Sequence, residues 1–252
     1  MSAALEARVA VERPIIFSAP MVRRLDLGLK TQTRRIVKDR PGWTPAVRPE
    51  VGWFEPQRKN RGSAPVFGAW CPVNGTARVS PVGAPGDFLW VRENFGLASA
   101  NHWPDLPHRV KPAPEPFAEV AYFKASYDRE TKLRWRPSIH MPRWASRTIL
   151  EIVGVRVEQL CGISEEDAIA EGVERAEDGI GWRSYDADAD DLGRAFLTAS
   201  RSFFSLWSAI HGAASVSANP WVWVVEFRKL EQRAPELRAL TPGNIEGDGL
   251  FP

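Results

Sequence analysis

The densest group of polar side chains in the chain is Lys-Thr-Gln-Thr-Arg-Arg, residues 30–35. Alternate residues of a strand share a face, so Thr33 and Arg35 lie together, and Lys30 at the preceding turn can lean toward them. A partly buried lysine has a lowered pKa and can act as a base toward a neighbouring hydroxyl. With a carboxylate beside it, such a Lys and Thr pair can hydrolyse an amide. These residues alone favour a simpler alternative, a solvated basic turn that contacts phosphate or nothing.

Regular elements must position these side chains. An apolar run at 13–17 predicts a strand, and Ser18 and Gly28 mark the two ends of a helix with apolar residues at helical spacing. The alternating, β-branched segment 31–37 predicts the strand that carries the polar group. Further elements are a turn and strand over 86–95, strands over 119–125, 147–160 (bulged or bent at Gly154) and 220–228, and a helix over 192–210.

Glu171 is a candidate for the carboxylate. Ser164-Glu165-Glu166-Asp167 has the form of a capping box, and the helix that it opens closes at Gly172. Glu171 therefore sits at a helix end, from which it can point into a cleft, although a surface carboxylate is an equal alternative. The rest of the acid-rich run over 165–191 is predicted to be a solvated loop.

The composition predicts an ordinary globular protein. The chain has 252 residues, 44% hydrophobic and 25% charged, which excludes a wholly disordered or collagen-like chain. We expect one domain over 1–230, irregular insertions at about 39–85 and 98–134 where Pro and Gly are frequent, and a disordered tail over 231–252. The net charge is 33 − 31 = +2. Any nucleic-acid surface must therefore be a local patch, for which the two basic segments 21–40 and 129–156 are candidates.

Several kinds of site are not expected. The phosphate-loop, dinucleotide, zinc-protease and esterase motifs do not occur, and the histidines have no Cys or acidic partners at ligand spacing, so we expect neither a cofactor nor a metal. Cys71 and Cys161 are interpreted as reduced thiols of the core. No stretch approaches the ~18 apolar residues of a membrane span, and the N-terminus has no apolar signal region. We therefore expect a cytoplasmic protein with no membrane partner.

Several segments resemble one family in the order in which they occur. They are RPIIFSAPM (13–21), GLKTQTRR (28–35), PGDFLWVRE (85–93), WRPSIHMPRWASR (135–147) with the strand that follows it, SEEDAIAEGV (164–173) and NPWVWVVEF (219–227). The chain resembles the ASCH family, of the wider PUA-like fold, and especially its phage- and prophage-encoded members. The pattern Gly-x-Lys-x-x-Thr-x-Arg is the most specific element of this resemblance.

The resemblance implies an α+β fold, namely a small mixed β-barrel flanked by helices with a cleft on one side. Some compact ASCH proteins are amidohydrolases of N4-acetylcytidine that use a Thr, Lys and Glu constellation with a nearby Arg. These roles fall on Lys30, Thr33 and Glu171 as catalytic residues and on Arg35 as a substrate-binding residue. This chain is much longer than the compact enzymes, and its insertions can close the pocket over a different substrate or block it.

The phage-type members also share Trp90, Arg92 and Glu93. On a strand Trp90 and Arg92 lie on one face and Glu93 on the other. We interpret all three as substrate-binding: Arg92 as a second cation, Trp90 as a stacking platform, and Glu93 as the carboxylate to consider if Glu171 points to solvent. A core Trp beside a strand-edge ion pair is the alternative.

The expected function is therefore the binding of a modified nucleoside or of an RNA or DNA base. The preferred activity is an amidohydrolase that removes the acyl group from N4-acylated cytidine. The alternative is a non-catalytic reader of RNA or modified DNA that uses the same cleft, and a phage structural or assembly factor is a third class. The location is the host cytoplasm if the protein is phage-encoded, and the oligomeric state is left open.

Overall fold

The computed structural model describes residues 8–38, 48–54, 65–99, 111–112, 119–126, 134–177, 179–185 and 195–230. Its strands are β1 (Glu12–Ile16), β2 (Gln32–Ile36), β3 (Glu50–Phe54), β4 (Val66–Trp70), β5 (Ala77–Val79), β6 (Phe88–Arg92), β7 (Phe95–Ser99), β8 (Lys111–Pro112), β9 (Glu119–Phe123), β10 (Ile149–Gln159) and β11 (Trp221–Lys229). Its helices are α1 (Ala19–Asp26), α2 (Glu165–Ala170), α3 (Ala199–His211) and α4 (Ala214–Ser217), with short 3-10 turns that include η3 (Lys124–Ser126), η4 (Ser138–His140) and η5 (Arg143–Ala145). The expected α+β class is confirmed.

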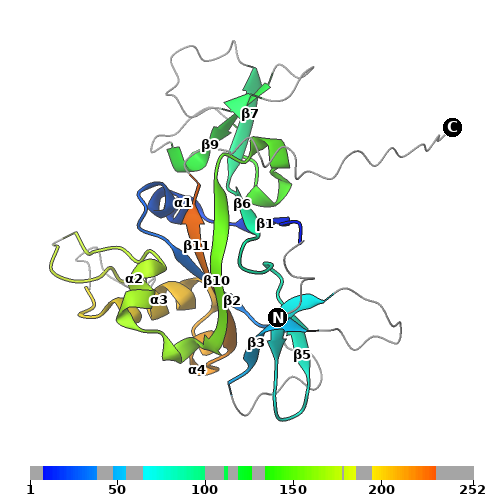
Figure 1. The fold of residues 1–252 in the computed structure, drawn as a ribbon. Coiled ribbons are helices and arrows are strands. Elements are labelled where there is room, and N and C mark those ends of the chain that lie inside the picture. Colours follow the sequence, from blue (N-terminus) through cyan, green and yellow to red (C-terminus); the bar gives the residue numbers. More distant parts are fainter. Residues whose placement is uncertain are drawn as a thin grey trace.

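A five-stranded sheet in the order β1-β6-β10-β11-β2 forms the centre (Figure 1). β1 and β6 are parallel and the other pairs are antiparallel, so the sheet is mixed. The expected closed barrel is not formed, because no backbone ladder joins β1 and β2 within the described residues. These two edge strands are linked by a side chain instead: Arg35 Nη2 donates to Ile16 O at 2.8 Å.

The central sheet has a different hydrophobic cluster on each face. On β11, Trp223 and Val225 join the cluster that includes Phe17, whereas Val222 and Val224 join the cluster under α2 and α3. Figure 1 shows α2 and α3 together beside β10. This alternation explains why β11 is an almost continuous apolar run, since a strand that is covered on both faces is apolar at successive positions.

Local sequence signals set the end of α1, the start of α2 and the bulge of β10. Gly28 has φ +71°, the left-handed conformation that ends α1. Ser164 Oγ accepts from Asp167 N at 3.1 Å and so caps α2. The register of β10 against β11 shifts between Ile152 and Gly154, where the bulge was expected.

The expected helix over 192–210 is wrong at its start, because α3 begins at Ala199. Phe196 instead forms a β-bridge with Trp182, with N to O distances of 2.7 and 2.8 Å. Glu165 at the start of α2 then accepts from Ala199 N at 2.7 Å and so fixes the N-terminus of α3. Thr198 is the N-cap.

The prediction of irregular insertions is wrong where the structure describes them. β3, β4 and β5 form an antiparallel sheet, and β7, β9 and β8 form another. In the first, the cross-strand pair Trp53–Phe67 and the ring contact between Phe54 of β3 and Trp70 of β4 place ring centroids 5.6 and 6.0 Å apart. Such aromatic pairs stabilise a sheet although Gly and Pro interrupt its sequence pattern. In Figure 1 the two small sheets lie near opposite ends of β10.

Other predictions have mixed outcomes. Cys71 is buried as expected, but Cys161 is exposed and is not a core thiol. Within the described residues, no helix is long and apolar enough to cross a membrane. The predicted disordered tail over 231–252 lies outside the described residues, and the single domain over 1–230 stays a prediction.

Candidate active site

Lys30 and Glu171 form a buried ion pair. Both residues are almost inaccessible, with 2% and 6% of their surface exposed. Lys30 Nζ donates to the Glu171 backbone oxygen at 2.6 Å and to Glu171 Oε2 at 3.0 Å. The ammonium therefore lies at the carbonyl end of α2, where the helix dipole also favours a positive charge.

The backbone around Gly172 brings the two residues together. Thr31 N donates to Ala170 O at 2.9 Å, which ties the start of β2 to the end of α2. Gly172 has φ +87°, and a Cβ at this position would lie 3.1 Å from Lys30 Cβ. Glycine is needed for both reasons, the left-handed conformation and the close approach of the lysine.

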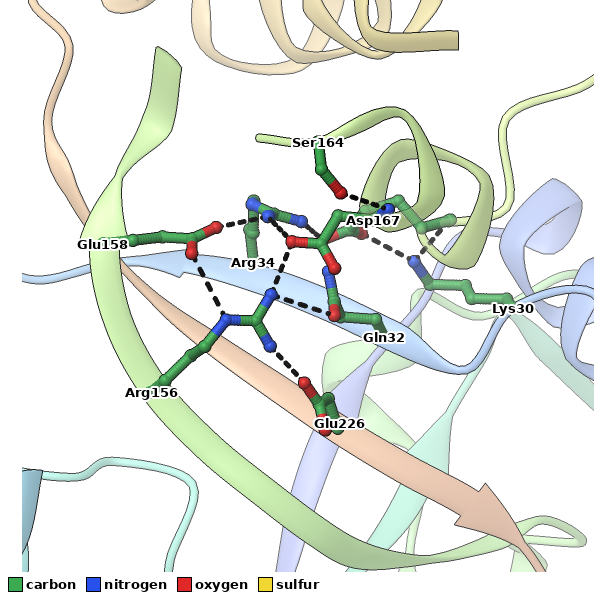
Figure 2. A network of polar contacts seen from close by, with 9 residues as sticks. Lys30, Gln32, Arg34, Arg156, Glu158, Ser164, Asp167 and Glu226 are labelled. Atoms are coloured by element: carbon green, nitrogen blue, oxygen red, sulfur yellow. Dashed lines mark hydrogen bonds and ion pairs between the residues drawn. The ribbon is translucent and has the colours of Figure 1, made fainter. Parts of the chain in front are cut away.

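Arg34 holds the other oxygen of Glu171. Its Nη1 donates to Glu171 Oε1 at 3.2 Å and its Nη2 to Asp167 Oδ2 at 2.8 Å, and it also binds Glu158. Arg156 donates to Glu158 Oε2 at 3.2 Å and also binds Asp167 and Glu226. Figure 2 shows that the two guanidinium groups share Glu158 and Asp167 between β2, β10 and α2.

Burial perturbs the ionisation of Lys30. Desolvation lowers the pKa of Lys30 below its ordinary value, Glu171 opposes this by favouring the ammonium, and Arg35 and Arg34 add to the lowering. A neutral amine has two N–H donors, and Glu171 offers two acceptors, its backbone oxygen and Oε2. The neutral form can therefore make both hydrogen bonds and keep a lone pair to accept a proton.

Thr33 and Arg35 lie on the other face of β2 from Arg34. Their partners on β11 are Val225 and Trp223, which belong to the cluster around Phe17. The Lys30 Nζ and the Arg35 guanidinium each lie 5.5 Å from the centre of the Phe17 ring, so both cations contact the same aromatic residue. Thr33 is buried, but no hydrogen bond joins its hydroxyl to Lys30 or Glu171 within the described residues. The structure thus brings Lys30, Glu171 and Arg35 together and places Thr33 beside Arg35 on the strand.

Burial also affects Arg35. It lowers the pKa of the Arg35 guanidinium, and the charge of Glu171 opposes this change. Arg35 still carries its charge near neutral pH, as arginines do in proteins. Arg35 differs from Arg34 in that it does not bind the Glu171 carboxylate directly. Its guanidinium group donates to Ile16 O instead.

Trp90 and Arg92 are not part of this group. Leu89 and Val91 point into the cluster around Phe17, so Trp90 and Arg92 point to the opposite face of β6. The Arg92 guanidinium lies 5.3 Å from the centre of the Trp90 ring, and Arg92 also donates to the backbone oxygen of Ile139. Within the described residues, no hydrogen bond or ion pair joins Trp90 or Arg92 to Lys30 or Glu171.

Glu93 is an internal ion-pair partner. It is buried, and both of its carboxylate oxygens accept from Arg147, at 2.7 and 2.9 Å. Burial raises the pKa of Glu93, while Arg147 opposes the rise. Because Glu171 does not point to solvent, Glu93 is not needed as a replacement carboxylate.

Sequence reasoning missed Arg34, Asp167 and Arg156. The signal was present, since alternation places Arg34 opposite Arg35 on β2, but only the face with Thr33 was considered. The solvated loop expected for the rest of the acid-rich run over 165–191 is also wrong for Asp167, which binds the buried Arg34 together with the candidate Glu171. Carboxylates of an acidic run can thus form ion pairs with a buried cation on a strand that is distant in the sequence.

The expected cationic patch is neutralised in part. Four arginines of the two basic segments bind carboxylates: Arg34, Arg143, Arg147 and Arg156. The described residues contain no group of three or more His, Cys, Asp or Glu side chains that could hold a metal ion. Lys30, whose pKa is lowered by burial, lies close enough to Arg35 for the charge of Arg35 to lower that pKa further.

Comparisons of the chain with family models, with curated proteins and with solved structures find no match.

Proposed function

We propose that this chain is an ASCH-type protein of PUA-like fold that binds a nucleoside or nucleic-acid base and hydrolyses the amide of an N4-acylated cytidine. The observation that carries the proposal is the buried Lys30–Glu171 pair, in which burial lowers the pKa of the lysine. A lysine with a lowered pKa is the kind of base that amide hydrolysis at neutral pH requires. The sequence resemblance supplies the substrate class.

In the proposed reaction, neutral Lys30 accepts a proton as an oxygen nucleophile attacks the acyl carbon. The nucleophile is either the hydroxyl of Thr33 or a water that Thr33 orients. The C–N bond then breaks, and the proton held by Lys30 passes to the departing cytosine amine. With water as nucleophile the products are the free carboxylic acid and the nucleoside. With Thr33, water hydrolyses the acyl ester in a second step.

Arg35 and Glu171 support this reaction in different ways. Arg35 lies at the same Phe17 ring as Lys30, so its charge can stabilise the oxyanion that develops on the acyl oxygen. Glu171 is a positioning residue that fixes Lys30 through two hydrogen bonds and stabilises its ammonium form after proton transfer. Arg34 in turn fixes Glu171.

The test is to incubate the full chain with N4-acetylcytidine and measure the release of acetate. We expect Lys30→Ala and Thr33→Ala each to lower the rate by roughly 10²- to 10⁴-fold, the range for loss of a general acid or base. Lys124→Ala is the matched control, because Lys124 is an exposed lysine on η3 and we expect no change there. Far-ultraviolet circular dichroism of each variant confirms that it is folded.

The outcomes separate an enzyme from a reader. Turnover that survives both Lys30→Ala and Thr33→Ala would contradict the mechanism. If the wild-type chain releases neither acetate from N4-acetylcytidine nor the corresponding carboxylate from longer N4-acyl cytidines, the enzyme proposal fails. Binding of these nucleosides without turnover would then support the reader.

A further inference from the structure

A second site candidate lies on the segment before β10. A pocket of about 560 Å³ is lined by five residues of one short stretch: Arg134, Trp135, Arg136, Pro137 and His140. This volume lies within the range of small-molecule sites. Two guanidinium groups, an imidazole and an indole thus converge on one hollow. None of these residues belongs to the Lys30 site.

The basic groups of this pocket are not neutralised by the described residues. Arg134, Arg136 and His140 are exposed, and none of them forms an ion pair with a carboxylate of the described segments. This differs from four other arginines of the two basic segments, which are bound by carboxylates: Arg34, Arg143, Arg147 and Arg156. An anion that enters the pocket therefore meets cations that no carboxylate of the described residues binds.

The pocket backbone is held in place. Arg136 N donates to Phe95 O at 2.7 Å and Phe95 N donates to Arg136 O at 3.2 Å. Ser138 N donates to Asn94 Oδ1 at 3.1 Å. Met141, directly after η4, is buried in the cluster with Phe95. Because the backbone is fixed, ligand binding orders fewer groups, which lowers its entropic cost.

A second indole lies beside the same segment. Trp90 lies between the guanidinium groups of Arg92 and Arg143, at 5.3 and 5.7 Å from its ring centre. Arg92 donates to the backbone oxygen of Ile139 within η4, which connects this stack to the pocket segment. Glu12 binds Arg143, so Arg92 is the cation beside Trp90 that no carboxylate of the described residues binds. An indole beside such a cation suits a base and its phosphate.

We propose that the Arg134–His140 pocket binds single-stranded nucleic acid, with a phosphate on the Arg134 and Arg136 guanidinium groups and a base against Trp135. Arginine matches phosphate oxygens with paired donors, and an indole face stacks on any base. The indole makes a nucleic acid a better fit than an acidic peptide, which would use the cations alone. The proposal is independent of amide hydrolysis.

The test measures binding of fluorescein-labelled single-stranded RNA and DNA 12-mers to the full chain by fluorescence anisotropy, over a series of salt concentrations. For the double variant Arg134→Gln/Arg136→Gln we expect binding to weaken by at least about 10-fold. The slope of log affinity against log salt should fall by about 0.7, because the two arginines share one phosphate and each lost phosphate contact contributes about 0.7 for single strands. Trp135→Ala should weaken binding by about 5-fold or more at every salt concentration.

Arg201→Ala is the matched control, because Arg201 is an exposed arginine on α3, away from the pocket segment. Binding of either RNA or DNA with the expected losses supports the proposal, and the two arms show which strand is preferred. The proposal is overturned if neither strand binds, if the double variant binds as the Arg201→Ala control does, or if only an oligoglutamate peptide binds. Acetate release from N4-acetylcytidine, measured on the same double variant, should be unchanged, so failure here is distinct from failure of the hydrolysis proposal.

Discussion

Replacing Arg34 with methionine tests whether the buried charge network supports the fold as well as the site. The Arg34 side chain is 0% exposed and binds Glu171, Asp167 and Glu158. Methionine has a similar length and removes the charge. The substitution leaves Glu171, itself 6% exposed, with Lys30 as its remaining ion-pair partner among the described residues.

The size of the effect follows from which carboxylates lose their partner. Removing one member of a buried ion pair costs about 3–5 kcal/mol, because an uncompensated charge stays buried. Asp167 and Glu158 keep Arg156 and Glu171 keeps Lys30 at Oε2, but the buried Oε1 of Glu171 loses the hydrogen bond from Arg34, so the loss falls mainly on Glu171. We therefore expect the lower end of that range, about 3 kcal/mol.

Arg156→Met is the matched comparison, since Arg156 binds two of the same carboxylates. Its side chain is 28% exposed, so water screens its pairs, and we expect a loss of about 1 kcal/mol or less. With a urea slope of about 2 kcal/mol per molar, the unfolding midpoint should fall by about 1.5 M for Arg34→Met and about 0.5 M for Arg156→Met. Equal shifts, or a larger shift for Arg156→Met, would refute the reasoning.

Two further predictions concern the contact between α2 and Lys30. Glu171→Gln removes the charge that favours the Lys30 ammonium, so the pKa of Lys30 should fall further. The rise of kcat/KM with pH should then move to lower pH at a reduced maximal rate, and a rise that moves to higher pH would contradict the pairing. Gly172→Ala should destabilise the fold by at least about 1 kcal/mol, since a left-handed alanine costs roughly this much and its Cβ would lie 3.1 Å from Lys30 Cβ. A urea midpoint that matches the wild-type value would show that the close approach is not required.

Strong local signals made part of the fold predictable. Ser18 and Gly28 bound α1 as expected, Ser164 caps α2, and Gly154 marks the bulge of β10. The meeting of Lys30 with Glu171 was anticipated from the resemblance together with the position of Glu171 at a helix end. The ends of the helices and the bulge depend on a few residues near in sequence, which is why local patterns indicate them. Lys30 and Glu171 are 141 positions apart, so their contact could be expected only through the resemblance.

The features that were missed depend on distant partners. The strands β3, β4 and β5 pair through aromatic residues whose contacts no local pattern reveals. The start of α3 is set by Glu165, which lies 34 residues before Ala199. Arg34 was overlooked because its carboxylates come from β10 and α2, and sequence periodicity does not show which strand face meets them.

The pH dependence of acetate release from N4-acetylcytidine, measured for the wild-type chain beside Lys30→Ala, tests the central claim most directly. Lys30 must be neutral to accept a proton, and burial lowers its pKa below the ordinary value of 10.5. The account predicts a wild-type rate that rises with pH and levels off below pH 10.5, and a rise that disappears in Lys30→Ala. A rise that persists in Lys30→Ala, or one with its midpoint at or above 10.5, would contradict the claim that this buried lysine is the base.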